Sequence, residues 1–126
     1  MVISQRRSKR SATSSRYKKN RSKKLCEQGR SPTLTKVDER KLKTIRVTGG
    51  NHKQKLLNEN IANLLDKKNK RYSQVKILSV VETPANRHFV RRSIITKGCI
   101  IQTEKGKAVI TNRSGQEGTI NAVLIE

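Results

Sequence analysis

The feature that most restricts how this chain can fold is a block of like charge at its N-terminus. The first 24 residues carry ten Lys and Arg side chains and no acid. The same stretch has few apolar residues, so it cannot bury enough surface to offset the entropy lost on ordering. Like charges also repel one another and keep a segment extended until a polyanion neutralises them. We therefore expect residues 1–30 to form an extended arm in front of a folded body over residues 31–126.

The rest of the chain is cationic as well. The whole sequence has a formal net charge of +21, and residues 31–126 still hold nineteen basic side chains against eight acidic ones. The polyanion that such a charge distribution most often meets is nucleic acid. Composition therefore directs the search for function towards binding of a nucleic acid.

The apolar pattern of the body predicts β-structure. Aromatic residues make up only 2% of the chain, so the core must be a small one of Val, Ile and Leu. Short apolar segments separated by glycine turns are typical of a sandwich or small barrel. The predicted fold is mainly β, a small antiparallel barrel-like body with a long extended basic arm. The predicted strands are 42–47, 75–81, 94–95, 100–101, 108–110 and 119–125, with 119–125 as the partner of 75–81.

Residues 56–65 are ambiguous. Leu56, Ile61 and Leu65 belong to a set of apolar residues that recurs at helical spacing, which favours a helix. Three Asn residues in and beside this set weaken that helix, because their side chains compete for backbone hydrogen bonds. Before this segment, Gly49-Gly50-Asn51 predicts a tight turn, and after it residues 66–70 predict a charged loop.

The sequence lacks the residue groupings that an enzyme or a metal site requires. His52 and His88 are the only histidines, 36 positions apart, and neither has spaced Cys or carboxylate ligands beside it. Cys26 and Cys99 form no C-x-x-C motif, and we expect both to be free thiols in a reducing compartment. The turn at residues 49–53 does not match a phosphate-binding loop. We therefore predict no enzyme activity, catalytic residue, metal, cofactor or small-molecule substrate.

No apolar run approaches the roughly 20 residues that span a bilayer, and no apolar segment follows the charged N-terminus as in a signal peptide. We expect a cytoplasmic protein without a membrane partner.

Three cationic segments are candidates for nucleic-acid binding: the arm, the Gly-Gly turn, and residues 86–92 after Pro84. Arg guanidinium pairs bidentately with phosphate and stacks on bases, which suits irregular RNA. The alternatives are a solvated charged loop at residues 86–92 and a solubilising or nuclear-localisation segment at the arm, and charge alone does not distinguish RNA from DNA. The candidate RNA-binding residues are Arg6, Arg7, Lys9, Arg10, Arg16, Tyr17, Lys18, Lys19, Arg21, Lys23, Lys24, Arg30, Asn51, His52, Lys53, Lys55, Asn86, Arg87, His88, Arg91, Arg92 and Lys97.

One stretch carries a specific resemblance. The sequence Thr83-Pro84-Ala85-Asn86-Arg87-His88-Phe89-Val90-Arg91-Arg92, followed by Ile94-Ile95-Thr96-Lys97-Gly98, closely resembles the signature of small-subunit ribosomal protein eight of the archaeal and eukaryotic type. The matching pieces elsewhere are Arg16-Tyr17-Lys18, Gly29-Arg30, Pro32-Thr33, Val47, Gly49-Gly50-Asn51, Gly115-Gln116, Gly118 and 121–125. The length resembles the compact archaeal form. Departures from the family pattern are Ser14-Ser15 and Arg6, where glycines are usual, and Cys99, often alanine.

The resemblance implies a mostly β, barrel-like body and a basic arm inserted among rRNA helices. It also implies strand or irregular β-structure for residues 56–65, which we adopt over the helix that the spacing favours. The arm would be disordered without RNA and fold on binding it. The implied role is structural, within the ribosome, with small-subunit rRNA and neighbouring small-subunit proteins as partners. The alternatives are a ribosome-assembly factor and a nonspecific DNA-compacting protein.

Overall fold

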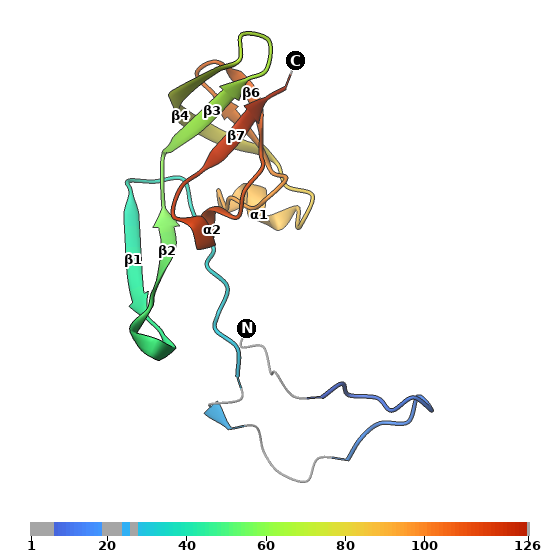
Figure 1. The fold of residues 1–126 in the computed structure, drawn as a ribbon. Helices are drawn as coiled ribbons and strands as arrows, with labels where there is room; N and C mark the ends of the chain where they lie inside the picture. Colours follow the sequence, from blue (N-terminus) through green and yellow to red (C-terminus); the bar gives the residue numbers. More distant parts are fainter. Residues whose placement is uncertain (1–6, 19–23, 26–27, 126) are drawn as a thin grey trace. The chain divides into compact units, whose positions relative to one another are not determined.

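The computed structural model describes residues 7–18, 24–25 and 28–125. The chain divides into two compact units, residues 1–32 and residues 33–126, and we describe each by itself. Figure 1 shows the fold, with the strands of the second unit labelled except β5. In the described part of the chain, no helix is both long enough and apolar enough to span a membrane.

The second unit is built around a closed five-stranded barrel in the order β3-β4-β5-β6-β7. Sequential neighbours pair antiparallel, while β3 and β7 close the barrel as a parallel pair. Since five strands of alternating direction leave the first and last running the same way, a closing pair of this kind has to be parallel. The predicted β-barrel is confirmed, with this one departure from antiparallel pairing. The strands are β3 Ile61–Asp66, β4 Arg71–Glu82, β5 Ile100–Thr103, β6 Gly106–Ile110 and β7 Asn121–Leu124.

The barrel core is aliphatic. Along β3 and β7 the side chains of Ala62, Leu64 and Ala122 point inward and are buried, while their neighbours in sequence are more exposed. Both Tyr17 and Tyr72 are exposed, and Phe89 is only half-buried, so no aromatic ring contributes to this core. The further buried members of the cluster are Leu56, Val75, Ile77, Val80, Ile95, Cys99, Ile101, Ala108, Ile110 and Ile120.

A two-stranded hairpin precedes the barrel. Strand β1 (Lys41–Arg46) pairs antiparallel with β2 (His52–Asn58) across a 3-10 turn, η2 (Thr48–Gly50). Gly49 and Gly50 have φ angles of +77° and +76°, which L side chains rarely adopt. Val47 donates its N–H to Asn51 O at 2.8 Å and so closes the turn. The strand predicted over 42–47 and the tight turn after it are confirmed.

The helical spacing in residues 56–65 is misleading. Leu56 belongs to β2, whereas Leu64 and Leu65 belong to β3, and the chain leaves strand conformation only at Glu59 and Asn60. Two strands in succession, the first with its apolar residues only near its end, place those residues at intervals that imitate a helix. The strand prediction adopted from the family resemblance is confirmed for this segment. The four residues after β3 form the predicted charged turn.

Two other details of the predicted strand pattern are wrong. Ile94 and Ile95 form no strand; they follow the short helix α1 (His88–Arg91), and Ile94 makes an isolated bridge with Lys36, which itself lies outside any strand. Residues 119–125 are not the partner of 75–81: β4 lies between β3 and β5, whereas β7 lies between β6 and β3. A second short helix, α2 (Ser114–Glu117), lies between β6 and β7.

The described part of the first unit contains a small local hairpin. Arg10 and Arg16 form an antiparallel bridge, and Tyr17 donates its N–H to Lys9 O at 3.1 Å. At the tip, the Arg10 guanidinium donates to Ser14 O at 2.8 Å, and Ser14 has a φ of +65°. A Ser- and Thr-rich loop therefore brings the two basic flanks of residues 9–17 side by side.

Candidate nucleic-acid interface

The β1–β2 hairpin has two unlike faces. Residues directly opposite each other in an antiparallel pair lie on the same side of the sheet. Lys43 is opposite Lys55, and Ile45 is opposite Lys53, so one face presents three lysines around one aliphatic side chain. Lys43 and Lys53 are exposed, and Lys55 is half-buried. The hairpin thus holds like charges in direct opposition, an arrangement that is unfavourable for strand pairing.

The other face of the hairpin joins it to the barrel. Leu56, opposite Leu42, is fully buried in the core. Further along, a Cβ placed on Gly118, just after α2, would lie 2.5 Å from Gln54 Oε1 and 3.3 Å from Leu42 Cδ1. The backbone of Gly118 therefore packs closely against the hairpin, which directs the lysine face away from the barrel.

An ion pair between the exposed Arg40 and the buried Glu59 holds the base of the hairpin. Glu59 is only 2% exposed, and its Oε2 accepts a hydrogen bond from Arg40 Nη1 at 2.9 Å. The second oxygen, Oε1, accepts the N–H of Ile61 at 3.4 Å. Since Arg40 neutralises Glu59, this acid does not reduce the positive charge that the hairpin presents.

The segment around α1 forms a second cationic strip. Asn86 starts the turn: its Oδ1 accepts the His88 N–H at 2.9 Å, and its carbonyl accepts the Phe89 N–H at 3.0 Å. Val90 packs against the barrel core, which leaves the basic side chains on the outside. The exposed side chains of this strip are Arg87, His88, Arg91 and Arg92. The structure thus gives Asn86 a role in shaping the loop that presents these arginines.

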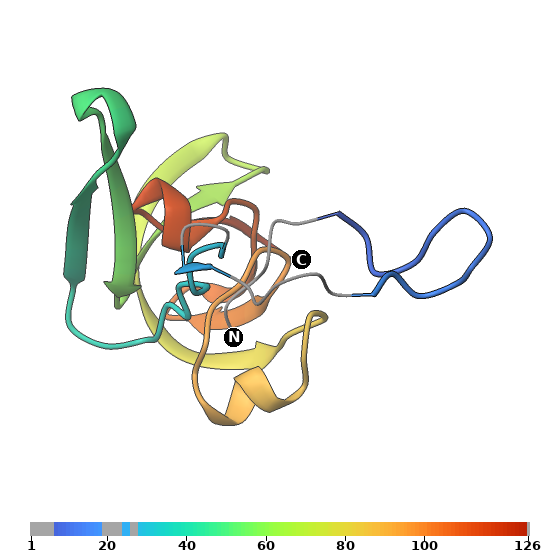
Figure 2. The same cartoon turned by 90° about the horizontal axis from the view of Figure 1, so that it is seen from below.

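One short segment links the two strips. Lys36 donates its N–H to Leu57 O at 3.0 Å on the hairpin side. On the other side, Val37 donates to Ser93 O at 3.2 Å and Ile95 donates to Thr35 O at 2.8 Å. Thr35 is buried and Val37 is half-buried, while Lys36 is exposed between them. Figure 2 shows this segment passing between the hairpin and α1. Lys36 therefore lies where the two strips meet.

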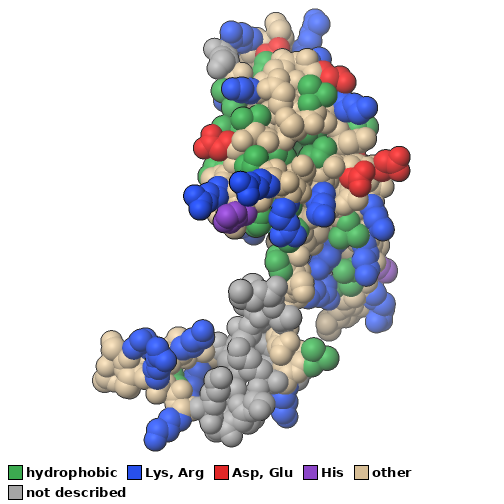
Figure 3. All heavy atoms as spheres, turned by 180° about the vertical axis from the view of Figure 1, so that it is seen from behind, with side chains coloured by type: hydrophobic (Ala, Val, Ile, Leu, Met, Phe, Trp, Pro, Cys, Tyr) green, Lys and Arg blue, Asp and Glu red, His purple; other side chains and the backbone are tan. Residues whose placement is uncertain are grey.

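These parts form one surface, which we call the cationic face. Figure 3 shows Lys and Arg side chains gathered over the lower half of the second unit, from the segment around α1 to the hairpin. Neither 41–58 nor 84–97 contains an acid; Asp38 and Glu39, at the start of the hairpin, are exposed nearby. The cationic face consists of Lys36, Lys41, Lys43, Lys53, Lys55, Arg87, Arg91 and Arg92.

The predicted binding residues fall into three groups. The predicted residues of the hairpin and of the segment 86–92 lie on one surface, with Asn51 and His52 exposed at the end of the hairpin. Lys97 is exposed too, but it lies near Glu117, whose pKa it helps to lower after the hydrogen bonds from Asn112 and Arg113. The predicted arm residues Arg7, Lys9, Arg10, Arg16, Tyr17, Lys18, Lys24 and Arg30 are exposed in the first unit, and Arg6, Lys19, Arg21 and Lys23 lie outside the described residues.

Tyr17 has a defined partner within the first unit. The Arg7 guanidinium lies over its ring, 3.7 Å from the ring centroid. Cation–π contacts of this kind place a guanidinium flat against an aromatic ring. The contact holds two of the predicted arm residues together.

Sequence reasoning missed three members of the cationic face. Lys41 and Lys43 lie on β1, and they belong to the site because β1 pairs with the strand that carries Lys53 and Lys55. Neither lies in a continuous basic segment, so the sequence alone carried no signal for them. Lys36 had no signal either, since its position depends on single hydrogen-bonded bridges rather than on a strand.

The described residues contain no group of three or more His, Cys, Asp and Glu side chains that could hold a metal. Cys99 is a free, buried thiol, and its burial raises its pKa. Cys26 lies outside the described residues.

A closed aliphatic barrel with a projecting basic hairpin and an exposed arginine strip defines a small cationic β-barrel protein with a surface typical of nucleic-acid-binding proteins. Comparison with known proteins identifies its family. The model of the family described as "Ribosomal protein S8e" matches residues 4–125, and the chain belongs to that family.

The relatives named "Small ribosomal subunit protein eS8" are similar over most of their length. The one from Methanocorpusculum labreanum is 53% identical over 125 residues, which cover 99% of this chain and 100% of the relative. The one from Methanobrevibacter smithii is 46% identical, again over 125 residues and with 99% and 100% covered. The one from Hyperthermus butylicus is 54% identical over 99 residues, 78% of this chain and 73% of the relative.

Proposed function

We propose that this protein is a structural constituent of the small ribosomal subunit that binds and stabilises rRNA through its cationic face and its basic arm. Membership of the ribosomal protein S8e family and the names of the relatives support the ribosomal role. Such a role needs no catalysis, cofactor or small-molecule substrate. The partners would be small-subunit rRNA and neighbouring small-subunit proteins, and the location would be the ribosome in the cytoplasm.

The observation that carries the rRNA-binding part is the junction at Lys36, which joins the hairpin lysines and the α1 arginines into one surface. Because this surface extends over both the hairpin and the α1 segment, it can contact phosphates on more than one RNA strand. The arginines suit bidentate pairing with phosphate and stacking on unpaired bases. The lysines act as point charges along the backbone of the RNA.

Binding would also stabilise the protein. The opposed Lys43 and Lys55 repel each other in the free hairpin, and phosphate groups between them would turn this repulsion into attraction. Binding of the arm would be favourable as well, because each cation that meets a phosphate releases a condensed counterion from the RNA. Protein and rRNA would therefore order each other during subunit assembly.

The test is binding to small-subunit rRNA and to duplex DNA of equal charge, titrated over salt concentration. We expect a preference for rRNA that persists at high salt. Arg91→Gln with Arg92→Gln should flatten the slope of log K against log salt by roughly 0.7–0.9 for each phosphate that the protein no longer neutralises. The matched control is Lys76→Gln with Lys105→Gln, which removes two exposed charges from the barrel strands and their turns.

A second variant examines the arm. Deleting residues 1–30 should flatten the salt slope further while leaving a preference for rRNA over DNA, because the cationic face remains. Equal affinity for rRNA and DNA, falling together as salt rises, would contradict the proposal and indicate a nonspecific charge binder.

A further inference from the structure

The barrel carries a second surface that the cationic face does not use. Leu65 on β3 is directly opposite Tyr72 on β4 and directly beside Val123 on β7, and Val123 is opposite Val109 on β6. These four side chains form one apolar row across four strands. Tyr72 is 79% exposed and the other three are half-buried, so the row faces outward.

A row of amides runs beside the apolar row. Two residues further along each strand, Gln74 is opposite Asn63, and Asn63 is beside Asn121. Gln74 Nε2 donates to Asn63 Oδ1 at 3.5 Å, and Asn63 Nδ2 donates to Asn121 Oδ1 at 3.1 Å. Thr111 continues the row on the far side, where its N–H donates to Asn121 O at 3.0 Å. The hydrogen bonds hold these side chains in a fixed order on the surface.

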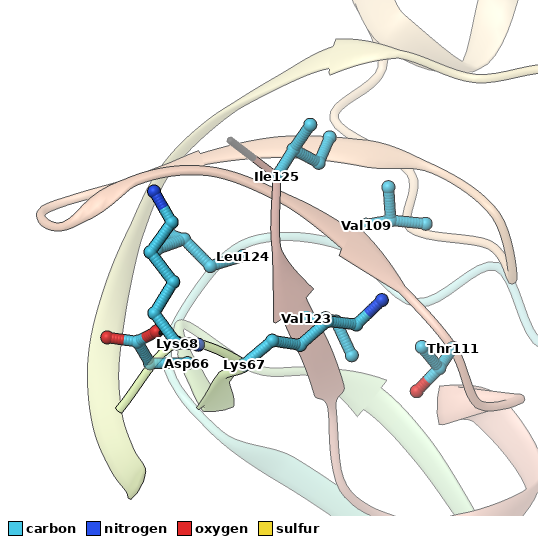
Figure 4. Close-up of a pocket in the computed structure, with 8 residues that line it drawn as sticks. All are labelled: Asp66, Lys67, Lys68, Val109, Thr111, Val123, Leu124 and Ile125. Atoms are coloured by element: carbon cyan, nitrogen blue, oxygen red, sulfur yellow. Dashed lines mark hydrogen bonds between the residues drawn. The ribbon is translucent and has the colours of Figure 1, made fainter. Parts of the chain in front are cut away.

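The two rows line two adjoining shallow hollows that share Thr111 and Val123. Figure 4 shows one of them: the Lys67 side chain extends across β7 beside Val123, and its ammonium group points towards Val109 and Thr111. Lys67 therefore places a positive charge directly over an apolar floor.

The turn between β3 and β4 adds more positive charge to the edge of the hollows. Residues 67–71 contain Lys67, Lys70 and Arg71, all exposed, besides Lys68, whose charge acts on Asp66. The one acid beside them, Asp66, is engaged by the turn, since its Oδ1 accepts the Lys68 N–H at 2.9 Å and its Oδ2 accepts Asn69 Nδ2 at 2.7 Å. The occupant that fits this edge is an anion.

The surface is small. Four strands about 4.8 Å apart and two rows about 7 Å apart give a platform of roughly 14 by 7 Å, on the order of 100 Å². A stable protein–protein interface buries about 800 Å² on each partner. The platform is too small for a globular partner but matches the size of a few nucleotides.

We propose that this surface, formed by the apolar and amide rows of β3, β4, β6 and β7, binds unpaired RNA nucleotides. The exposed Tyr72 ring stacks on a base, the amides of Gln74 and Asn63 hydrogen-bond base edges, and the cations of the β3–β4 turn bind phosphates. The inference goes beyond the proposed function, because it concerns a different surface and a single-stranded ligand.

The test follows Tyr72 with short RNA. In the full chain, Tyr17→Phe leaves Tyr72 as the one tyrosine, and the protein has no tryptophan. The probe is a decamer of uridine, at a salt concentration that suppresses nonspecific charge binding. We expect it to quench the Tyr72 fluorescence. By anisotropy of labelled RNA, Tyr72→Ala should weaken binding roughly 5- to 150-fold, as for the loss of one stacked base.

Two controls accompany the variant. Tyr72→Phe keeps the ring and should keep the affinity. Leu78→Ala removes another exposed side chain from the same strand, 60% exposed and away from the two rows, and should have no effect. Both positions are exposed, so each variant should fold.

Two results would overturn the inference. One is binding of the decamer without quenching and without a Tyr72→Ala effect, which would locate the RNA elsewhere. The other is tighter, Tyr72-dependent binding of decaglutamate, which would make the occupant an acidic peptide. Neither touches the proposed function, since the loss of rRNA affinity in the Arg91→Gln and Arg92→Gln variant is measured separately.

Discussion

The barrel and the β1–β2 hairpin show two ways of using β-structure within one unit. In the barrel, every strand contributes buried aliphatic side chains to one core. In the hairpin, Leu56 is the one fully buried residue of the two strands; most of the others are exposed, and five of the others are Lys or Arg. A two-stranded hairpin is marginally stable by itself in water. The barrel is thus stabilised by burial, and the hairpin depends on its contacts with the barrel and on what binds it.

The hairpin is the region in which stability is lower and charge is arranged for binding. Like charges directly opposite each other on a sheet are unfavourable, yet Lys43 and Lys55 are placed so. An anion lying across both would relieve the repulsion between them. We therefore expect substitutions in the two regions to separate stability from RNA affinity.

The largest expected effect is on the barrel core. Ile101→Ala removes a fully buried side chain and should lower the free energy of unfolding by about 2–5 kcal/mol. Ile45→Ala, the matched change in the hairpin at a half-buried position, should cost less than about 1 kcal/mol. Urea unfolding of both variants measures the two values, and equal losses would remove the distinction between the regions.

The next effect concerns the contact that joins the regions. Gly118 has a φ of +78° and packs against Gln54, so Gly118→Ala should lower stability by about 1–2 kcal/mol through backbone strain, plus the cost of displacing Gln54. Gly50→Ala is the control, since its φ of +76° is nearly the same but nothing lies within 4 Å of its added Cβ. A Gly50→Ala loss as large as that of Gly118→Ala would mean that close packing adds nothing.

A smaller effect should have opposite signs in two assays. Lys43→Glu places an acid opposite Lys55 and should stabilise the free protein by about 0.2–1 kcal/mol. The same change should weaken rRNA binding and flatten its salt slope by about 1. Thermal unfolding and salt titration of one variant measure both, and a parallel loss in stability and affinity would contradict a binding role for the lysine face.

The smallest effect is a pH dependence near the hairpin contact. The Asn112 side chain, donating to Glu117 Oε2 at 3.0 Å, and the Arg113 N–H hold the pKa of Glu117 below its ordinary value of 4.5. Because the pKa is lowered on folding, the stabilisation is present above pH 4.5 and is lost as pH falls through the folded value. Glu117→Gln should therefore be less stable than the native chain at neutral pH and equal to it in strong acid, as judged by unfolding at several pH values.

Much of the barrel could be predicted from the sequence. Short apolar segments separated by glycine turns identified β4, β5, β6 and β7, because a chain almost without aromatic residues has to build its core from β-branched side chains. The parallel pairing of β3 with β7 could not be predicted from the sequence, because it follows from the number of strands in the barrel. That number includes β3, which the helical spacing of residues 56–65 did not indicate.

The segment 56–65 shows why periodicity failed. Inside β3 the buried residues are Ala62 and Leu64, which alternate as in any strand. Ala62 is too small to stand out in an apolar pattern, while the exposed Ile61 does stand out. The large apolar residues that dominate the sequence pattern are therefore spaced as in a helix, whereas the residues that are buried in β3 alternate as in a strand.

The cationic face was predicted in parts rather than as a surface. Sequence reasoning found the arginines around α1 and the lysines of β2, which lie in continuous basic segments. The lysines of β1 can be assigned to this face only once the register of β1 with β2 is known. Lys36 can be assigned to it only once its bridges to Asn58 and Ile94 are known. Long-range pairing of this kind has no local signature.

The most direct test of the account is amide hydrogen exchange in the free protein and in its complex with small-subunit rRNA. We predict fast exchange in β1 and β2 of the free protein, slow exchange in the barrel strands, and strong new protection of the hairpin amides on rRNA binding. Hairpin amides already as protected as the barrel, or unchanged by rRNA, would contradict the claim that this hairpin is an rRNA-binding element stabilised by its ligand.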